Sequence, residues 1–242
     1  TLDGLLTLFP FEKQCFAKTS LPVHYVGHPL VSQIPKETKT DTPPILAIFP
    51  GSRETEIRRN FPLQIAAAKK LANLDPNLQI AVSVAQPIFE PLLRNLAAGA
   101  ATIFYPPEQK TALMRSARMA MATSGTVTLE LALHAVPTIV GFAIRPIDLF
   151  IAQKIASITL PFYCIDNIIL SKQVFPELFG PHFTEDALVS WGHRLWSDLE
   201  ARKEMLNNCE SLRKHLGEQN GSQAAARAIL NFGINSMKAL AF

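Results

Sequence analysis

A tight turn followed by a cation occupies residues 49–54, which read Phe-Pro-Gly-Ser-Arg-Glu. Gly51 allows the backbone to turn sharply and to approach a ligand closely, and Ser52 could cap the helix that we expect to follow. The free N–H groups at the start of a helix attract anions, and the planar guanidinium of Arg53 suits a diphosphate or a carboxylate. The same residues also suit an ordinary strand-to-helix turn, so the spacing alone leaves both interpretations open.

A second loop, rich in small hydroxyl residues, occupies positions 123–130 and reads Thr-Ser-Gly-Thr-Val-Thr-Leu-Glu. Ser124, Gly125 and Thr126 offer backbone and side-chain donors to phosphate oxygens. Glu130 could accept two hydrogen bonds from a ribose, although a glutamate also simply favours the positive end of a helix dipole. Because open α/β sheets bind ligands at the carboxyl ends of their strands, two such loops together favour a phosphate-containing ligand.

The chain lacks the fingerprints of several other chemistries. Neither loop matches GxGxxG or GxxxxGK[ST], which argues against a nicotinamide cofactor and an ATP-hydrolysing P-loop. GxSxG and HExxH are also absent, and the six histidines show no metal spacing, although His28 remains a residue of interest. Cys15, Cys164 and Cys209 are odd in number and far apart, which argues against a disulfide framework and a zinc site. We therefore expect no cofactor and no metal.

Short apolar runs alternate with segments of helical period through the middle of the chain. The expected buried strands are Ile45–Phe49, Gln79–Val84, Met119–Ala122 and Thr138–Gly141. The expected helices are Glu54–Asn73, Pro87–Leu96, Glu108–Arg115 and Thr126–His134. This alternation predicts an α/β fold of Rossmann type, in which a parallel sheet carries helices on both faces.

Changes in composition divide the chain into three parts. Residues 36–44 form a linker rich in Lys, Thr, Asp and Pro, and we place a domain boundary within it, after residue 40. Residues 1–40 would be the remnant of a preceding domain with the crossover between domains, and residues 41–183 a Rossmann-like domain. Residues 184–242 then have a helical pattern only, and we expect this tail to pack back on the fold. The chain starts without Met and with a strand-like run at Leu5–Phe9, so we expect it to be part of a longer protein.

Composition and charge limit the classes of partner. With 48% hydrophobic residues, the 242-residue chain can bury a sizeable core, and its net charge of +3 comes from 23 basic residues scattered among 20 acidic ones, so we expect no nucleic acid. No run reaches the roughly 18 apolar residues of a membrane span. We expect a cytoplasmic protein that at most lies on the cytoplasmic face of the inner membrane. A strongly apolar helix expected over Ile147–Ile158 fits either the core or such a surface.

The two loops stand in an ordered series of short motifs that resembles the lipid-A-disaccharide synthases. The series comprises FPFEK at 9–13, YVGHP at 25–29, FPGSR at 49–53 with Glu56, SGT at 124–126 with Glu130, residues 137–141, DN at 166–167, PEL at 176–178 and QAA at 223–225, and so covers nearly the whole chain. That family is similar to other GT-B glycosyltransferases, in which two Rossmann-like domains face each other across a cleft. The resemblance implies that this chain is the C-terminal half, which holds the nucleotide-sugar.

The resemblance also implies an activity and roles for the site residues. The donor would be UDP-2,3-diacylglucosamine, the acceptor 2,3-diacylglucosamine 1-phosphate, and the products UDP and a β-1,6-linked lipid A disaccharide. Residues 51–53 would lie near the diphosphate, residues 124–126 would complete the phosphate cradle, Glu130 would hold the ribose, and Asn167 would help to close the donor site. The family's general base would lie in the N-terminal acceptor domain, outside these residues. We therefore assign no catalytic residue, and we expect the chain alone to be inactive.

Several positions depart from the residues that are usual in this family, and four of them could affect the donor site. Phe142, Ala143, Asp166 and Lys172 stand where the family has Tyr, Arg, Pro and Arg. Two arginines that the family usually has in the donor site are thus missing from these positions. Lys172 and Arg145 are the candidates to replace their positive charges. The departures leave the acyl preference open.

Two other functions fit the same residues. One is a different UDP-sugar enzyme of the same architecture, such as a UDP-N-acetylglucosamine 2-epimerase or a cell-wall glycosyltransferase, because the fold and its phosphate loops are widely shared. The other is a non-catalytic nucleotide-binding domain, which half of a two-domain cleft would permit. A glycosyl-transfer assay on the full-length protein separates the three.

Overall fold

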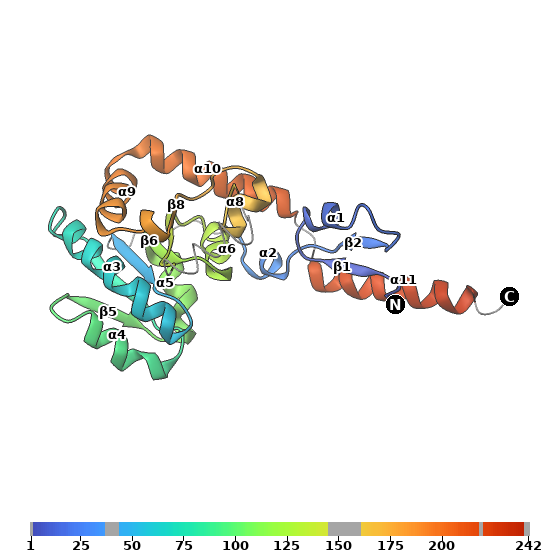
Figure 1. The fold of residues 1–242 in the computed structure, drawn as a ribbon, viewed down its shortest axis with the longest axis horizontal. Coiled ribbons are helices and arrows are strands. Elements are labelled where there is room, and N and C mark those ends of the chain that lie inside the picture. Colours follow the sequence, from blue (N-terminus) through green and yellow to red (C-terminus); the bar gives the residue numbers. More distant parts are fainter. Residues whose placement is uncertain (1, 37–43, 145–160, 218–219, 240–242) are drawn as a thin grey trace.

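A six-stranded parallel sheet forms the centre of the larger lobe of the protein (Figure 1). The computed structural model describes residues 2–36, 44–144, 161–217 and 220–239. The strands, in the spatial order β5-β4-β3-β6-β7-β8, are β5 (Thr102–Tyr105), β4 (Gln79–Ser83), β3 (Ile45–Phe49), β6 (Ala117–Thr123), β7 (Thr138–Phe142) and β8 (Glu177–Phe179). Each neighbouring pair runs parallel. This doubly wound order puts the topological switch point between β3 and β6, the two strands that precede the candidate loops.

Helices connect the strands and cover both faces of the sheet, as the sequence predicts. They are α3 (Glu54–Ala72), α4 (Glu90–Leu96), α5 (Lys110–Ser116), α6 (Thr126–Leu133) and α8 (Ile165–Leu170), with short 3-10 turns η1 (Pro87–Phe89), η2 (Pro107–Gln109) and η4 (Gly180–His182). The tail forms α9 (Glu185–Ser197), α10 (Leu199–Leu216) and α11 (Gly221–Ala239). Thr184 caps α9 through Ala187 N–H, and Asp198 caps α10, which explains where these two helices begin.

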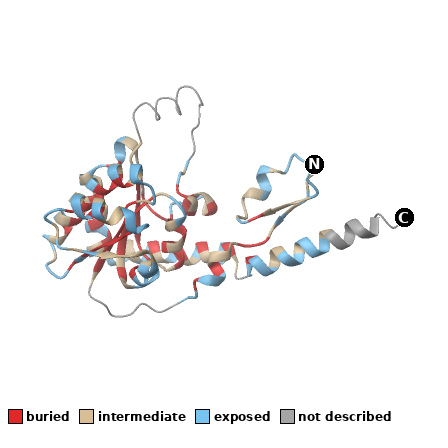
Figure 2. Ribbon diagram, turned by 90° about the horizontal axis from the view of Figure 1, so that it is seen from below, coloured by how far each residue is buried: buried red, intermediate tan, exposed pale blue. Residues whose placement is uncertain are grey.

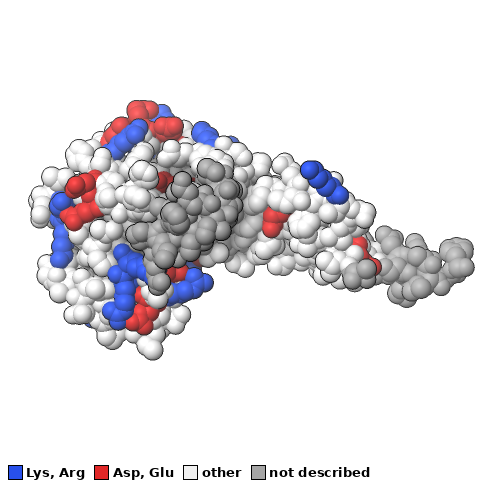
Figure 3. All heavy atoms as spheres, viewed as in Figure 1, with Lys and Arg blue, Asp and Glu red and all other residues white. Residues whose placement is uncertain are grey.

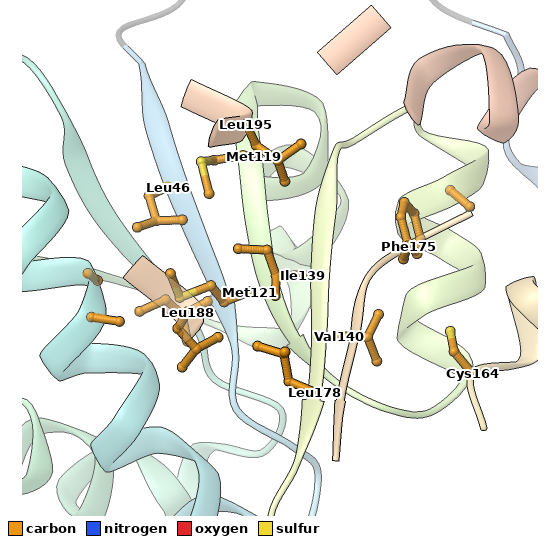
Figure 4. Packing of buried hydrophobic residues seen from close by; sticks show 14 of the residues in the cluster. Leu46, Met119, Met121, Ile139, Val140, Cys164, Phe175, Leu178, Leu188 and Leu195 are labelled. Atoms are coloured by element: carbon orange, nitrogen blue, oxygen red, sulfur yellow. The ribbon is translucent and has the colours of Figure 1, made fainter. Parts of the chain in front are cut away.

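The hydrophobic core lies on both sides of the sheet. Every residue of β3 is buried, and its side chains alternate between the two faces, so both must be covered. On one face, Leu46 and Ile48 belong to a cluster that includes residues of α3, α9 and α10 (Figure 4). On the other face, Ala47 packs in a smaller cluster that includes Leu113 and Met114 of α5. Figure 2 shows the buried residues concentrated in this lobe.

Two strands near the start of the chain form a separate parallel sheet. Its strands are β1 (Leu5–Thr7) and β2 (Val23–Tyr25), accompanied by the short helix α1 (Glu12–Cys15). The next helix, α2 (Pro29–Gln33), contacts α6, and its Val31 belongs to the core of the larger lobe. The tail helix α11 lies along the two-stranded sheet (Figure 1), where the ring of Phe232 meets that of His24 at 5.2 Å. Helices α9 and α10 instead pack on α3 and α6 of the larger lobe. The tail therefore contacts both parts of the molecule.

The four strands and four helices expected in the middle of the chain are present, with ends shifted by at most three residues. The sequence reading did not identify β5 or β8. Strand β5 is a sheet edge with partly exposed residues, and β8 has only three residues, so neither has the continuous apolar run of a buried strand. The expected helix Ile147–Ile158 lies outside the described residues. None of the helices in the described ranges is both long and apolar enough to cross a membrane.

Candidate functional site

A cavity of about 280 Å³ opens at the switch point, where the carboxyl ends of β3, β4 and β6 meet. Its wall combines residues that are far apart in the sequence: 49–52 and Glu56, 83–85, Pro107 and Lys110, and 123–127 with Glu130. The backbone thus brings together both loops that the sequence predicts to bind phosphate. The wall includes the apolar residues Val84, Pro107 and Val127 together with residues that carry hydroxyl and charged groups.

The first loop turns at Gly51, whose φ of +120° strongly favours glycine. Helix α3 then begins, with Arg53 as its N-cap and without a side-chain cap. The prediction that Ser52 caps the helix is therefore wrong, because the N-cap position is occupied by the next residue, Arg53. Instead, the Ser52 N–H donates a hydrogen bond to Oε2 of Glu56 at 3.0 Å.

Arg53 lies at the rim of this loop rather than deep in the cavity. Its side chain is 77% exposed, and its Nη1 donates to Oε1 of Glu56 at 2.6 Å. The Glu56 side chain, by contrast, is only 15% exposed and lines the cavity. A carboxylate of the protein thus occupies the donors that the sequence suggests for an external anion.

The second loop opens directly into the cavity. Gly125 is the N-cap of α6, and a methyl group at this position would meet nothing within 4 Å among the described atoms. Thr126 and Ser124 line the cavity beside it. The buried Thr128 donates its hydroxyl to the Gly125 carbonyl at 2.8 Å, which fixes the first turn of α6. The loop is thereby held from the core side and open on the cavity side.

Glu130 forms an ion pair with Lys110, a residue that the sequence reading did not identify. The Lys110 Nζ lies 2.8 Å from Oε1 and 2.7 Å from Oε2 of Glu130, and both side chains line the cavity. Their side chains are 38% and 16% exposed. The sequence signal for Lys110 was its position in the first turn of a helix that follows a strand, which alone is weak.

Asn167 and Lys172 do not line this cavity. Asn167 is fully buried, and its amide group holds the loop after α8: Oδ1 accepts from the N–H groups of Val174 and Phe175, and Nδ2 donates to the Phe175 carbonyl and to Glu177. Lys172 donates from Nζ to Oδ1 of Asn208 at 2.9 Å. Both residues are therefore engaged in contacts of their own in this structure.

The departures from the usual family residues fall in two settings. Ala143 follows β7, and its N–H donates to the buried Asn60 of α3 at 2.8 Å. Phe142 is half-buried at the end of the same strand and packs near Phe179. Arg145, the other expected cation, lies outside the described residues.

Asp166 is fully buried at the start of α8. Its Oδ2 accepts the Cys164 thiol at 3.0 Å, while Oδ1 has no hydrogen-bond partner among the described residues. Burial, above all, raises the pKa of Asp166, and burial likewise raises the pKa of the Cys164 thiol. Burial thus favours the protonated form of both groups.

His28 has a structural position. Its Nδ1 accepts the Leu30 N–H at 3.3 Å and caps α2, its ring lies 5.1 Å from that of Phe9, and burial lowers its pKa. Within the described ranges, no group of three or more His, Cys, Asp or Glu residues is arranged to hold a metal ion.

Comparison with known proteins identifies relatives over nearly the whole chain. The family model described as Lipid-A-disaccharide synthetase matches residues 1–231. Lipid-A-disaccharide synthase of Synechocystis sp. is 29% identical over 99% of this chain and 64% of its own length. The Coxiella burnetii (strain CbuG_Q212) enzyme of the same name is 31% identical over 95% of this chain and 63% of its own, and that of Chlamydia pneumoniae is 38% identical over 74% and 32%. The chain therefore spans less than two thirds of these relatives.

Solved structures of similar fold are more distant in sequence. The UDP-GlcNAc 2-epimerase of Neisseria meningitidis, bound to UDP-GlcNAc, has a TM-score of 0.60 at 12% identity, covering 86% of this chain and 55% of the epimerase. The GtfA/B complex has a TM-score of 0.55 at 13% identity, covering 96% and 46%. WaaG, a glycosyltransferase involved in lipopolysaccharide biosynthesis, has a TM-score of 0.51 at 18% identity, covering 78% and 48%. At these identities the likeness concerns the fold alone, which is that of about half of a GT-B protein.

Proposed function

The chain belongs to the lipid-A-disaccharide synthetase family, and from this membership we propose that its cavity binds the UDP part of an acylated sugar donor in lipid A biosynthesis. The observation that carries the proposal is the cavity at the switch point between β3 and β6. In doubly wound sheets this point is where nucleotides bind. The reaction that we propose comes from family membership, and we assign to the cavity the nucleotide-binding side of the active site.

The composition of the wall suits a nucleoside diphosphate. Val84, Pro107 and Val127 offer an apolar surface for a base, while the hydroxyl and amide groups of residues 124–126 suit phosphate oxygens. Glu130 suits the two ribose hydroxyls as an acceptor, and Lys110 adds a cation beside it. A cavity of about 280 Å³ is at the small end of ligand sites, which fits a nucleotide better than a whole diacylated donor.

The complete reaction would transfer 2,3-diacylglucosamine from UDP-2,3-diacylglucosamine to 2,3-diacylglucosamine 1-phosphate. The acceptor 6-hydroxyl attacks the anomeric carbon, the bond from that carbon to the UDP oxygen breaks, and the hydroxyl proton passes to a base. We assign this base to no residue of the chain. The two substrates carry acyl chains, so we propose that the enzyme works at a membrane surface.

The role that we propose for this chain in the chemistry is stabilisation of the leaving UDP. Negative charge grows on the diphosphate as the bond breaks, and the amide groups at the start of α6, with Arg53 and Lys110, can offset it. A well-placed donor of this kind typically contributes about 3 to 4 kcal/mol to a transition state. Asn167 would act from a distance by fixing the loop after α8, and Lys172 is no longer part of the proposed donor site.

Calorimetric titration of the 242-residue chain with UDP tests the binding role. We expect saturable binding of UDP, weaker binding of uridine, and no disaccharide from acylated substrates, because the cavity forms only one wall of a GT-B cleft. Failure to bind UDP would refute the proposed function. A glycosyl-transfer assay on the full-length protein, with a labelled acylated acceptor, separates disaccharide synthesis from epimerase activity and from binding alone.

A further inference from the structure

The carboxylate of Glu56 is bound to the donors of the first loop. Its Oε2 accepts the Ser52 N–H at 3.0 Å, and its Oε1 accepts the Arg53 guanidinium at 2.6 Å. Both oxygens are therefore satisfied by groups that could equally bind a phosphate. An incoming anion would meet these donors already in use.

The turn at Gly51 is shaped around this carboxylate. A methyl group at position 51 would lie 2.7 Å from the Glu56 Cβ and 2.8 Å from its Oε2, closer than carbon atoms and carboxylates approach one another. The glycine therefore provides the space that Glu56 fills, in addition to its positive φ. Because Glu56 also lines the cavity, its charge faces any ligand there.

The charged side chains at the cavity and its rim form two ion pairs. Glu56 is paired with Arg53, and Glu130 is paired with Lys110. Figure 3 likewise shows basic and acidic side chains side by side on the visible face of the larger lobe. A diphosphate that binds at the first loop must therefore take Arg53 from the Glu56 carboxylate that already holds it.

We propose that Glu56 is a built-in competitor of the nucleotide diphosphate: it binds the Ser52 N–H and Arg53, and it gives them up when the diphosphate binds. This inference rests on the proposed function. The exchange makes UDP binding weaker than the donors alone would allow, because each new bond replaces an existing one. For an enzyme that must release UDP after each turnover, such weakening speeds product release.

Two other roles for Glu56 predict different results. A simple helix cap would affect folding but not ligand affinity, since Glu56 lies in the first turn of α3. A residue that only orients Arg53 toward the diphosphate would strengthen binding, and its removal would weaken UDP. The competitor role alone predicts that loss of the charge tightens the diphosphate.

The test is titration of wild type and Glu56→Gln with UDP, uridine and inorganic pyrophosphate. Glutamine keeps an acceptor oxygen for the Ser52 N–H but loses the charge that holds Arg53. We expect UDP and pyrophosphate to bind about tenfold more tightly, the factor typical of one charge-assisted hydrogen bond, and uridine to change by less than about twofold. In an Arg53→Ala background the gain should shrink, because one of the two contested donors is gone.

Glu54→Gln is the matched control. Glu54 stands in the same helical turn and loses the same charge, but it pairs with Arg58 in solvent, where the two side chains are 55% and 57% exposed. It should leave all three affinities within about twofold. Unchanged or weaker pyrophosphate and UDP binding by Glu56→Gln would overturn the inference. If wild type binds no UDP, the proposed function fails, and the pyrophosphate comparison alone still decides the role of Glu56.

Discussion

The ammonium group of Lys110 lies 2.7 Å and 2.8 Å from the two carboxylate oxygens of Glu130, joining the first turn of α5 to the middle of α6 across the cavity wall. The Glu130 side chain is only 16% exposed, so water solvates the carboxylate poorly when the lysine is removed. The pair therefore has a structural role of its own, separate from any contact with a ligand.

We predict that Lys110→Met destabilises the protein by about 1 kcal/mol, which lowers the Tm by roughly 2 to 4 °C in a chain of this size. The cause is a partly buried carboxylate left without its cation. The double variant Lys110→Met with Glu130→Gln should recover most of the loss, because no unpaired charge remains. Lys69→Met, which removes a half-buried lysine whose Nζ donates to the Ala98 carbonyl, is the control for loss of a lysine charge elsewhere on the larger lobe. Additive effects of the two cavity substitutions would contradict the prediction.

The proposed ribose contact of Glu130 can be separated from its charge. We expect Glu130→Ala to weaken UDP and uridine by similar factors, about five- to tenfold, because both ligands offer the same two hydroxyl groups. 2′,3′-Dideoxyuridine diphosphate has no such hydroxyls and should lose little affinity. Loss of the Glu130 charge can also change the electrostatic interaction with the diphosphate, which UDP and the analogue share. The ratio of the affinity for UDP to that for the analogue cancels this effect and is therefore the decisive quantity. A ratio that stays at its wild-type value would show that Glu130 does not hold the ribose.

A glycine-to-alanine pair distinguishes the two loops. Gly51→Ala should lower the Tm and the affinity for UDP together, because the φ of +120° and the seat of Glu56 both exclude a methyl group. The cost should be at least about 1 kcal/mol. Gly125→Ala is the matched control for folding, since its backbone is extended and a methyl group meets nothing within 4 Å. Circular dichroism melts of both variants give the comparison, and equal Tm values would count against it.

Much of the fold could be predicted because β3, β4, β6 and β7 are buried on both faces. Burial on both faces requires continuous apolar runs, and these runs are visible in the sequence. Strand β5 lies at the edge of the sheet, so part of it faces solvent and its pattern is mixed. Strand β8 joins the sheet through three residues, and its pairing with β7 depends on tertiary contacts that a local pattern does not contain.

The candidate site could be predicted only where polar residues stand in a turn that directly follows a recognisable strand. Gly51 and Gly125 stand directly after apolar strands, so their loops were visible. Lys110 lies 20 residues before Glu130, and only the folded sheet brings the two together. Asn167 was interpreted as a donor-site residue because it belongs to a family motif, but its amide makes four hydrogen bonds within its own region. A motif gives a residue type and not the direction of its side chain.

The buried Asp166 should make stability depend on pH. Burial raises its pKa in the folded protein above the value near 4 of an unfolded chain, so the folded state holds the proton more tightly. The contribution of the neutral acid is fully present below the unfolded pKa and is lost as pH rises through the folded pKa. We therefore expect wild type to lose stability relative to Asp166→Asn as pH rises from 4 to 8, by about 1 to 3 kcal/mol.

Urea unfolding of both proteins across this pH range measures the difference directly. The asparagine has nearly the same shape and no charge, so its curve should lack the loss that the buried carboxylate causes. Asp75→Asn is the control of opposite sign, because hydrogen bonds from the Asn77 N–H and from Trp196 lower the pKa of Asp75. Its contribution is present above the unfolded pKa and is lost only in acid. This variant keeps Asp166 and should therefore run parallel to wild type between pH 5 and 8. If the stability of Asp166→Asn also runs parallel to that of wild type, the carboxyl group of Asp166 does not titrate in this range. Its raised pKa would then not explain any loss of stability with pH.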